Sequence, residues 1–192
     1  EEQVNKVVRT CYGQLRQIGH IRKYLSKDST AILVNATITS RLDYLNSLLY
    51  GLPHSLLHKL ELVQNNAARL LLKCGRREHI TPLLKTLHWL PIPYRIEFKI
   101  MLLAFKWLHN DAPPYLISFS YPYQPFRTLR SSSRCLLSQP KSRLCKAGDR
   151  AFSVCAPRLW NDLPVEVRDC KTLSSFKTAL KTHLFKIAFN CT

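Results

Sequence analysis

The chain has 192 residues, of which 46% are hydrophobic, enough for one sizeable domain or two small ones. With 5 Gly and 11 Pro it is neither collagen-like nor of low complexity, and its hydrophobic content argues against a wholly disordered chain. Its 29 Lys and Arg against 12 Asp and Glu give a formal charge of +17, which predicts a polyanionic partner, nucleic acid ahead of a membrane surface. The only Met is Met101, so we expect a piece of a longer protein.

The N-terminal third carries the apolar spacing of three helices. Ser26 or Asp28 can cap the second helix, and Ser55 can cap the third, which Gly75 is placed to end. The apolar face of the first helix is formed by Val4, Val8, Cys11, Leu15, Ile18 and Leu25. That of the second includes Ile32, Leu33, Ala36, Leu42, Leu45 and Leu49.

The middle of the chain reads as helix punctuated by proline. Thr81-Pro82 predicts the start of a short helix that runs to about His88. Pro93 opens a longer helix to about Asn110. Its apolar residues lie nearly all round it, which is typical of a buried helix; they are Ile96, Phe98, Ile100, Met101, Leu102, Leu103, Phe105, Trp107 and Leu108.

A basic loop follows, rich in proline and serine. Guanidinium and hydroxyl donors suit phosphate contact, so the loop is the first candidate for nucleic-acid binding. Its cations are Arg127, Arg130, Arg134, Lys141, Arg143, Lys146 and Arg150. The alternation in residues 135–138 and 142–146 also permits one short β-hairpin across Gln139-Pro140.

Cations on the first helix form the second candidate. Arg16, Arg22 and Lys23 lie mostly off its apolar stripe, where they either contact phosphates or form a solvated face.

The predicted fold is mainly α, a helical bundle followed by a helical C-terminal region. The C-terminal helices span about Ala151 to Asn161 and a final amphipathic stretch capped by Thr172 or Ser174. The expected divisions are a three-helix bundle over 1–75, central helices over 76–118, the basic loop or hairpin over 119–150 and C-terminal helices over 151–192.

Patterns that carry catalysis or bind metals are missing from the sequence. The seven Cys are odd in number and widely spaced, and Cys74, His79 and His88 give only a weak zinc signal. No phosphate-binding glycine loop, nucleophile elbow, H-E-x-x-H or Asp-Asp pair occurs. No apolar stretch is long enough to span a membrane. We therefore expect a non-enzyme without metal or cofactor, in the reducing nucleus or cytoplasm.

Several runs of the sequence resemble one family. In this order and over nearly the whole chain, they are similar to the thumb and C-terminal region of LINE-type (non-long-terminal-repeat) retrotransposon reverse transcriptases. The runs are Ser40-Arg41-Leu42-Asp43-Tyr44, Asn46 to Pro53, Leu62-Val63-Gln64-Asn65, His79-Ile80-Thr81-Pro82, Leu87-His88-Trp89-Leu90-Pro91, Tyr94-Arg95-Ile96, Gly148 to Val154 and Ala156 to Asn161.

The resemblance implies a thumb-like bundle that grips a template–primer of RNA and DNA, with the palm domain of the parent RNA-directed DNA polymerase as a further partner. The palm's Asp-Asp motif and the endonuclease of the family have no counterpart here, so the implied role is non-catalytic. The alternatives are a protein-interaction helical domain and a decayed retrotransposon fragment without selected function.

Overall fold

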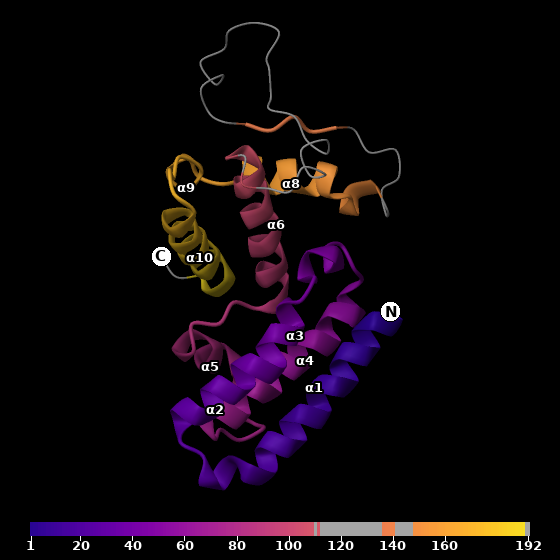
Figure 1. The fold of residues 1–192 in the computed structure, drawn as a ribbon, viewed down its shortest axis with the longest axis vertical. Helices are drawn as coiled ribbons and strands as arrows, with labels where there is room; N and C mark the ends of the chain where they lie inside the picture. The colour runs from indigo at the N-terminus through magenta and orange to yellow at the C-terminus, as the bar shows by residue number, and fades with distance from the viewer. Residues whose placement is uncertain (110, 112–135, 141–147, 191–192) are drawn as a thin grey trace, which may run out of the picture. The chain divides into compact units, whose positions relative to one another are not determined.

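The computed structural model describes residues 1–109, 111, 136–140 and 148–190. This part of the chain is mainly helical, which confirms the predicted fold class (Figure 1). Contacts divide the chain into two units, Glu1–Ile96 and Glu97–Thr192. The first unit thus extends beyond the bundle expected to end at residue 75. One strand of the permitted hairpin, residues 142–146, lies outside the described residues.

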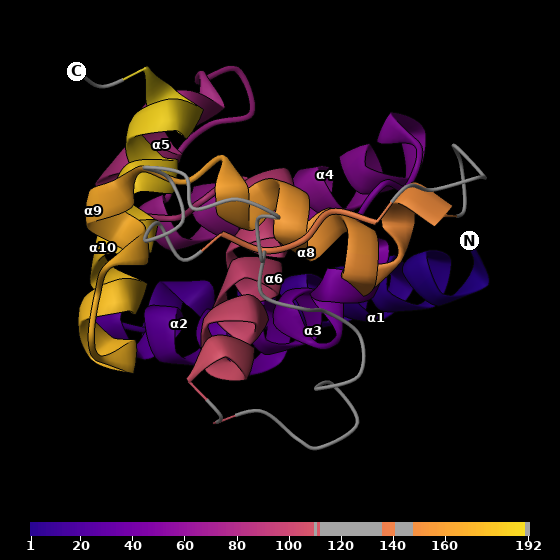
Figure 2. The same ribbon diagram turned by 90° about the horizontal axis from the view of Figure 1, so that it is seen from above.

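The first unit is a bundle in which α1, α2 and α4 contact one another (Figures 1 and 2). Its core consists of aliphatic side chains, among them Val34, Ile38, Leu60 and Val63, each at most 2% exposed. The elements are α1 (Glu2–Ile21), a 3-10 turn (Arg22–Tyr24), α2 (Lys27–Val34), a π-helical turn (Asn35–Thr39), α3 (Ser40–Asp43), a 3-10 turn (Asn46–Leu49), α4 (His54–Leu72), α5 (Ile80–Thr86) and the first residues of α6 (Ile92–Leu108).

The helix predicted after residue 26 begins where expected. The Ser26 hydroxyl accepts a hydrogen bond from the Ser29 N–H at 3.0 Å, the geometry of an N-cap. Its apolar face was predicted wrongly, because Ile32 and Leu45 are 68% and 54% exposed. Leu45 has a left-handed backbone with φ of 52° and follows the end of α3.

A π-helical turn follows α2 and aligns the side chains that are buried instead. In a regular α-helix, residues four apart drift by about 40° per step, so Val34, Ile38 and Leu42 would spread over about 80°. The wider turn over Asn35–Thr39 takes up the drift, and all three side chains are buried.

Three helix ends also differ from the sequence prediction. α4 begins at His54, after Pro53, rather than at a Ser55 cap. It ends in a left-handed residue, as expected, but that residue is Lys73, with φ of 56°, and not Gly75. α5 is capped by His79, whose Nδ1 accepts from the Thr81 N–H at 3.4 Å.

The second unit is built on aromatic packing between helices. The rings of Phe105 and Phe176 stack with centroids 4.3 Å apart, and the Trp160 ring lies 5.6 Å from that of Phe176. The expected Thr172 cap is present, accepting from the Ser175 N–H at 3.2 Å. The described elements after α6 are a 3-10 turn (Gly148–Arg150), α8 (Phe152–Asn161), α9 (Val165–Arg168) and α10 (Leu173–Phe189).

Candidate nucleic-acid interface

Helix α1 has two chemically opposite faces. The buried face carries Val4, Cys11, Leu15 and Ile18. The other face continues into the 3-10 turn after the helix, and we call it the basic face. Its residues recur at intervals of three and four and so share a stripe about 100° wide. They are Lys6, Arg9, Gly13, Arg16, His20 and Lys23, all exposed.

The basic face carries one negative charge, at the start of the helix. Glu2 precedes Lys6 by four residues and so lies on the same stripe, and Glu1 comes just before the helix. None of the ion pairs among the described residues includes a member of this face. The Lys23 ammonium lies over the Tyr24 ring, 4.8 Å from its centroid. With four Lys and Arg side chains against the one carboxylate of Glu2, the face has a net positive charge, which attracts a polyanion.

Arg22 lies beside this face in sequence but has a different role. It is only 8% exposed, and its guanidinium donates to three carbonyl oxygens. Nε donates to Leu70 at 3.0 Å, Nη2 to Leu71 at 3.0 Å and Nη1 to Leu25 at 2.9 Å. The carbonyls at the C-terminal end of a helix lack partners within it, and a cation there also complements the helix dipole. Arg22 thus fastens the end of α1 to the end of α4.

A signal for this role was present in the sequence. Arg22 follows Ile18 by four residues and Leu15 by seven, so it continues the apolar stripe of α1. A cation in register with a buried stripe is expected to find buried acceptors rather than solvent.

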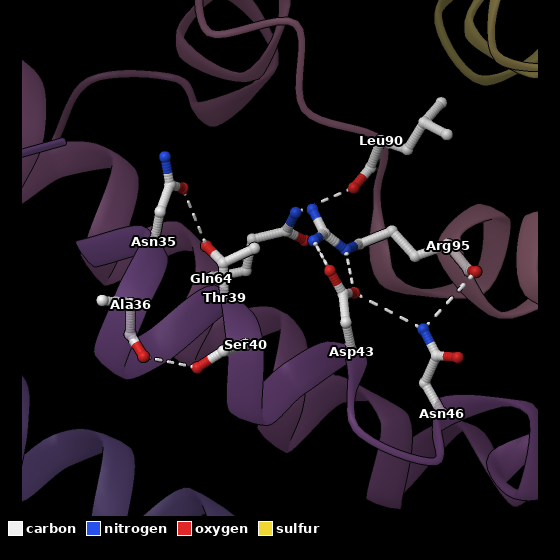
Figure 3. Close-up of polar contacts among 9 residues, drawn as sticks. All are labelled: Asn35, Ala36, Thr39, Ser40, Asp43, Asn46, Gln64, Leu90 and Arg95. Carbon is white, nitrogen blue, oxygen red and sulfur yellow. Dashed lines mark hydrogen bonds and ion pairs between the residues drawn. The ribbon is translucent and has the colours of Figure 1, made fainter. Parts of the chain in front are cut away.

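A polar network inside the first unit joins segments distant in sequence (Figure 3). The Asp43 carboxylate accepts two hydrogen bonds from the Arg95 guanidinium, one from Nε at 2.8 Å. Asn46 Nδ2 donates to Asp43 Oδ1 at 3.4 Å and to the Arg95 carbonyl oxygen at 3.5 Å. The buried amide of Gln64 donates to the Leu90 carbonyl oxygen at 2.8 Å.

These five residues all come from the runs that resemble LINE-type reverse transcriptases. Gln64 is 1% exposed and Asn46 is 4% exposed, so a ligand in solvent does not reach them. The Nδ2 amide of Asn46 and the Nε2 amide of Gln64 donate to backbone carbonyls of distant segments, and these contacts stabilise the first unit. Spacing alone did not reveal this network, because its members meet only in the folded chain.

The basic loop lies mostly beyond what the structure describes. Of its seven candidate residues, Arg150 is described and is exposed in the 3-10 turn Gly148–Arg150. The six that fall outside the described residues are Arg127, Arg130, Arg134, Lys141, Arg143 and Lys146.

Two of the four cysteines that the structure describes, Cys11 and Cys155, are buried. Among described residues, no group of three or more His, Cys, Asp or Glu is placed to hold a metal ion. Burial raises the pKa of Cys155 to about 11 and raises the pKa of Cys11 above its ordinary value. Both groups are therefore thiols at neutral pH, and thiols are poor nucleophiles.

Among described residues, no helix is both long enough and apolar enough to cross a membrane. Comparisons with models of known protein families, with curated proteins and with solved structures gave no match.

Proposed function

We propose that this chain is a non-catalytic, nucleic-acid-binding fragment of a LINE-type reverse transcriptase that grips a template–primer of RNA and DNA through phosphate contacts. The observation that carries the proposal is the basic face of α1, where four Lys and Arg side chains are exposed against a single carboxylate, Glu2, at the start of the helix. The sequence runs that resemble the family support the same role.

The chemistry of the basic face suits binding that ignores sequence. Lys and Arg side chains contact phosphates, which are the same at every nucleotide, whereas base recognition needs side chains placed against base edges. A polymerase thumb needs such indifference because every nucleotide passes it.

The surrounding contacts keep this face in place. Arg22 ties the C-terminal end of α1 to the carbonyls of Leu70 and Leu71. Near the other end, Lys59 Nζ donates to Asn5 Oδ1 at 2.9 Å, which again joins α4 to α1. The cations are thus presented by a helix that is fixed at both ends, which lowers the entropy lost on binding.

The basic loop supplies a second set of contacts in this proposal. Arg150 is its described member, and its other candidate cations extend the same chemistry along the sequence. The palm domain of the parent polymerase would be the protein partner.

A salt titration tests the proposal. Binding of the full chain to an RNA·DNA hybrid is followed by fluorescence anisotropy from about 50 to 200 mM salt. Replacing Lys6, Arg9, Arg16 and Lys23 with Gln is expected to flatten the plot of log affinity against log salt by about 3 to 4, since each phosphate contributes about 0.9. The matched control replaces four exposed cations in or near α10 with Gln. They are Lys171, Lys177, Lys181 and Lys186.

The control variant loses the same charge and is expected to keep a steeper slope than the α1 variant. Equal slopes for the two variants would show that only the net charge matters and that the basic face is not the contact surface. Absence of binding by the unchanged chain would refute the proposed function itself.

One observation favours a second candidate, a protein-interaction domain. Tyr44, Leu45 and Leu48 are 70%, 54% and 68% exposed, and they line a hollow of about 140 Å³ with other, mostly apolar, residues of the first unit. Exposed apolar side chains around a hollow are typical of protein contacts. Binding of a protein partner that does not weaken with salt, together with absence of nucleic-acid binding, would favour this alternative.

A further inference from the structure

The fold does not explain why residue 13 is a glycine. It lies in the middle of α1, where glycine costs about 1 kcal/mol relative to alanine. Its backbone does not have the positive φ that favours glycine. A Cβ atom built on it would meet no described atom within 4 Å, so packing does not require its absence.

Gly13 is placed at the centre of the basic face. It follows Arg9 by four residues and precedes Arg16 by three, so one turn of helix separates it from a guanidinium on either side. From Lys6 to Lys23 the face is about 26 Å long, at 1.5 Å per residue. The helix backbone is therefore most accessible at the middle of a row of cations.

The α1 residues that flank the basic face between Asn5 and Gly19 are uncharged. Thr10, Gln14 and Gln17 lie along one side of it, and Asn5, Tyr12 and Gly19 along the other, where Lys59 of α4 donates to Asn5. A helix inserted in a DNA major groove about 12 Å wide has phosphates on both flanks. The cations of α1 itself form a single stripe and instead match a single line of phosphates.

We propose that Gly13 is the point at which the sugar–phosphate backbone of one bound nucleic-acid strand comes closest to α1. Arg9 and Lys6 contact phosphates on one side of this point, and Arg16 and Lys23 on the other. This inference rests on the proposed function and assigns the bound strand a position. The strand is either single or one strand of a duplex, because both present the same line of phosphates.

The test uses substitutions that keep every charge. Gly13→Ala and Gly13→Leu add a side chain on the basic face. Gly19→Ala is the matched control, because it is the same substitution on the flank of the same helix. At Gly19 a Cβ would lie 4.0 Å from Leu70 Cδ1, an ordinary van der Waals contact. Urea unfolding and binding to a single strand and to a duplex of equal length are measured for each variant.

Stability and affinity are expected to change in opposite directions at Gly13. Gly13→Ala should raise the urea midpoint, because alanine is the better helix former, while weakening binding by about threefold. Gly13→Leu should weaken binding at least about tenfold. Gly19→Ala should also raise the midpoint but leave the affinity within about twofold. Weakening for the single strand alone or the duplex alone identifies which form lies on the face.

Wild-type affinity of folded Gly13→Leu for both nucleic acids would overturn this inference. The proposed function would survive that result if the Gln variant of the four cations still flattened the salt dependence. Failure of the unchanged chain to bind any nucleic acid would overturn both.

Discussion

Replacing Arg22 with Met is expected to destabilise the first unit far more than removing any exposed cation of α1. Met keeps much of the length and apolar contact of the side chain but none of its five donors. The carbonyls of Leu70 and Leu71 then lose their guanidinium partner at the end of α4. The hydrogen bond to Leu71 is buried, and a buried acceptor left without a hydrogen bond costs about 1 to 3 kcal/mol, so we expect a loss of about that size.

The Leu70 and Leu25 carbonyls add little to this figure. Their hydrogen bonds to Arg22 are only partly buried, so water can replace the lost donor. Against a typical domain stability of about 5 to 15 kcal/mol, the expected loss is a measurable fraction of the whole. Arg22→Lys keeps the charge but cannot reproduce the guanidinium fork, and it should fall between Met and wild type.

Urea unfolding followed by far-UV circular dichroism measures the effect. Lys23→Met is the matched control, since it removes a charge from the neighbouring, exposed residue, and its effect should stay within about 0.5 kcal/mol. Equal urea midpoints for the Arg22 and Lys23 variants would refute the assignment of a structural role to Arg22. At low temperature, where both remain folded, the Lys23 variant should be the weaker binder of nucleic acid.

Three further predictions concern an ion pair, a carboxyl group and the basic loop. Asp43→Asn should lower the stability more than Arg95→Met. The Arg95 side chain is 15% exposed and the Asp43 side chain 42%, so Asp43→Asn leaves the more buried charge, that of Arg95, unpaired. Urea midpoints in the reverse order would contradict this. Burial raises the pKa of Glu97, and nearby Arg158 only partly opposes it. The ionised carboxylate therefore destabilises the fold at neutral pH, so Glu97→Gln should raise the melting temperature at pH 7. That gain should shrink as the pH falls through the raised pKa towards the ordinary value of 4.5, where the native carboxyl is protonated; a gain that does not depend on pH would exclude this cause. Changing Arg130, Arg134 and Arg143 to Gln should flatten the salt dependence of binding by about 2 to 3 and weaken all nucleic-acid sequences alike, and an unchanged slope would exclude the loop as a contact surface.

Helix content followed directly from the sequence because periodicity and caps are local. The Ser26 and Thr172 caps are confirmed, and α8 lies close to its predicted range. The wide turn over Asn35–Thr39 was missed, because a regular period was assumed through it. Lys73, rather than Gly75, ends α4, which shows that a neighbouring glycine does not fix where a helix stops.

Only part of the candidate site could be predicted from the sequence. The excess of positive charge is a property of composition, and it indicates a polyanionic partner whatever the fold. The register of Arg22 with the apolar stripe of α1 separates it from Arg16 and Lys23, whereas its carbonyl partners could be identified only in the folded chain. The partnership of Asp43 with Arg95, 52 residues apart, needed the folded chain.

The wide turn over Asn35–Thr39 also bears on insertions and deletions. A helix of the same length with regular turns throughout would rotate every residue after the turn by most of a quarter circle. Leu42 would leave the core, and Asp43 would no longer face Arg95. Removing one residue from the turn restores a regular helix and returns both side chains to their present directions. Within this helix, Asn35–Thr39 is thus the stretch where losing a residue preserves the ion pair, whereas the same loss in α3 would break it.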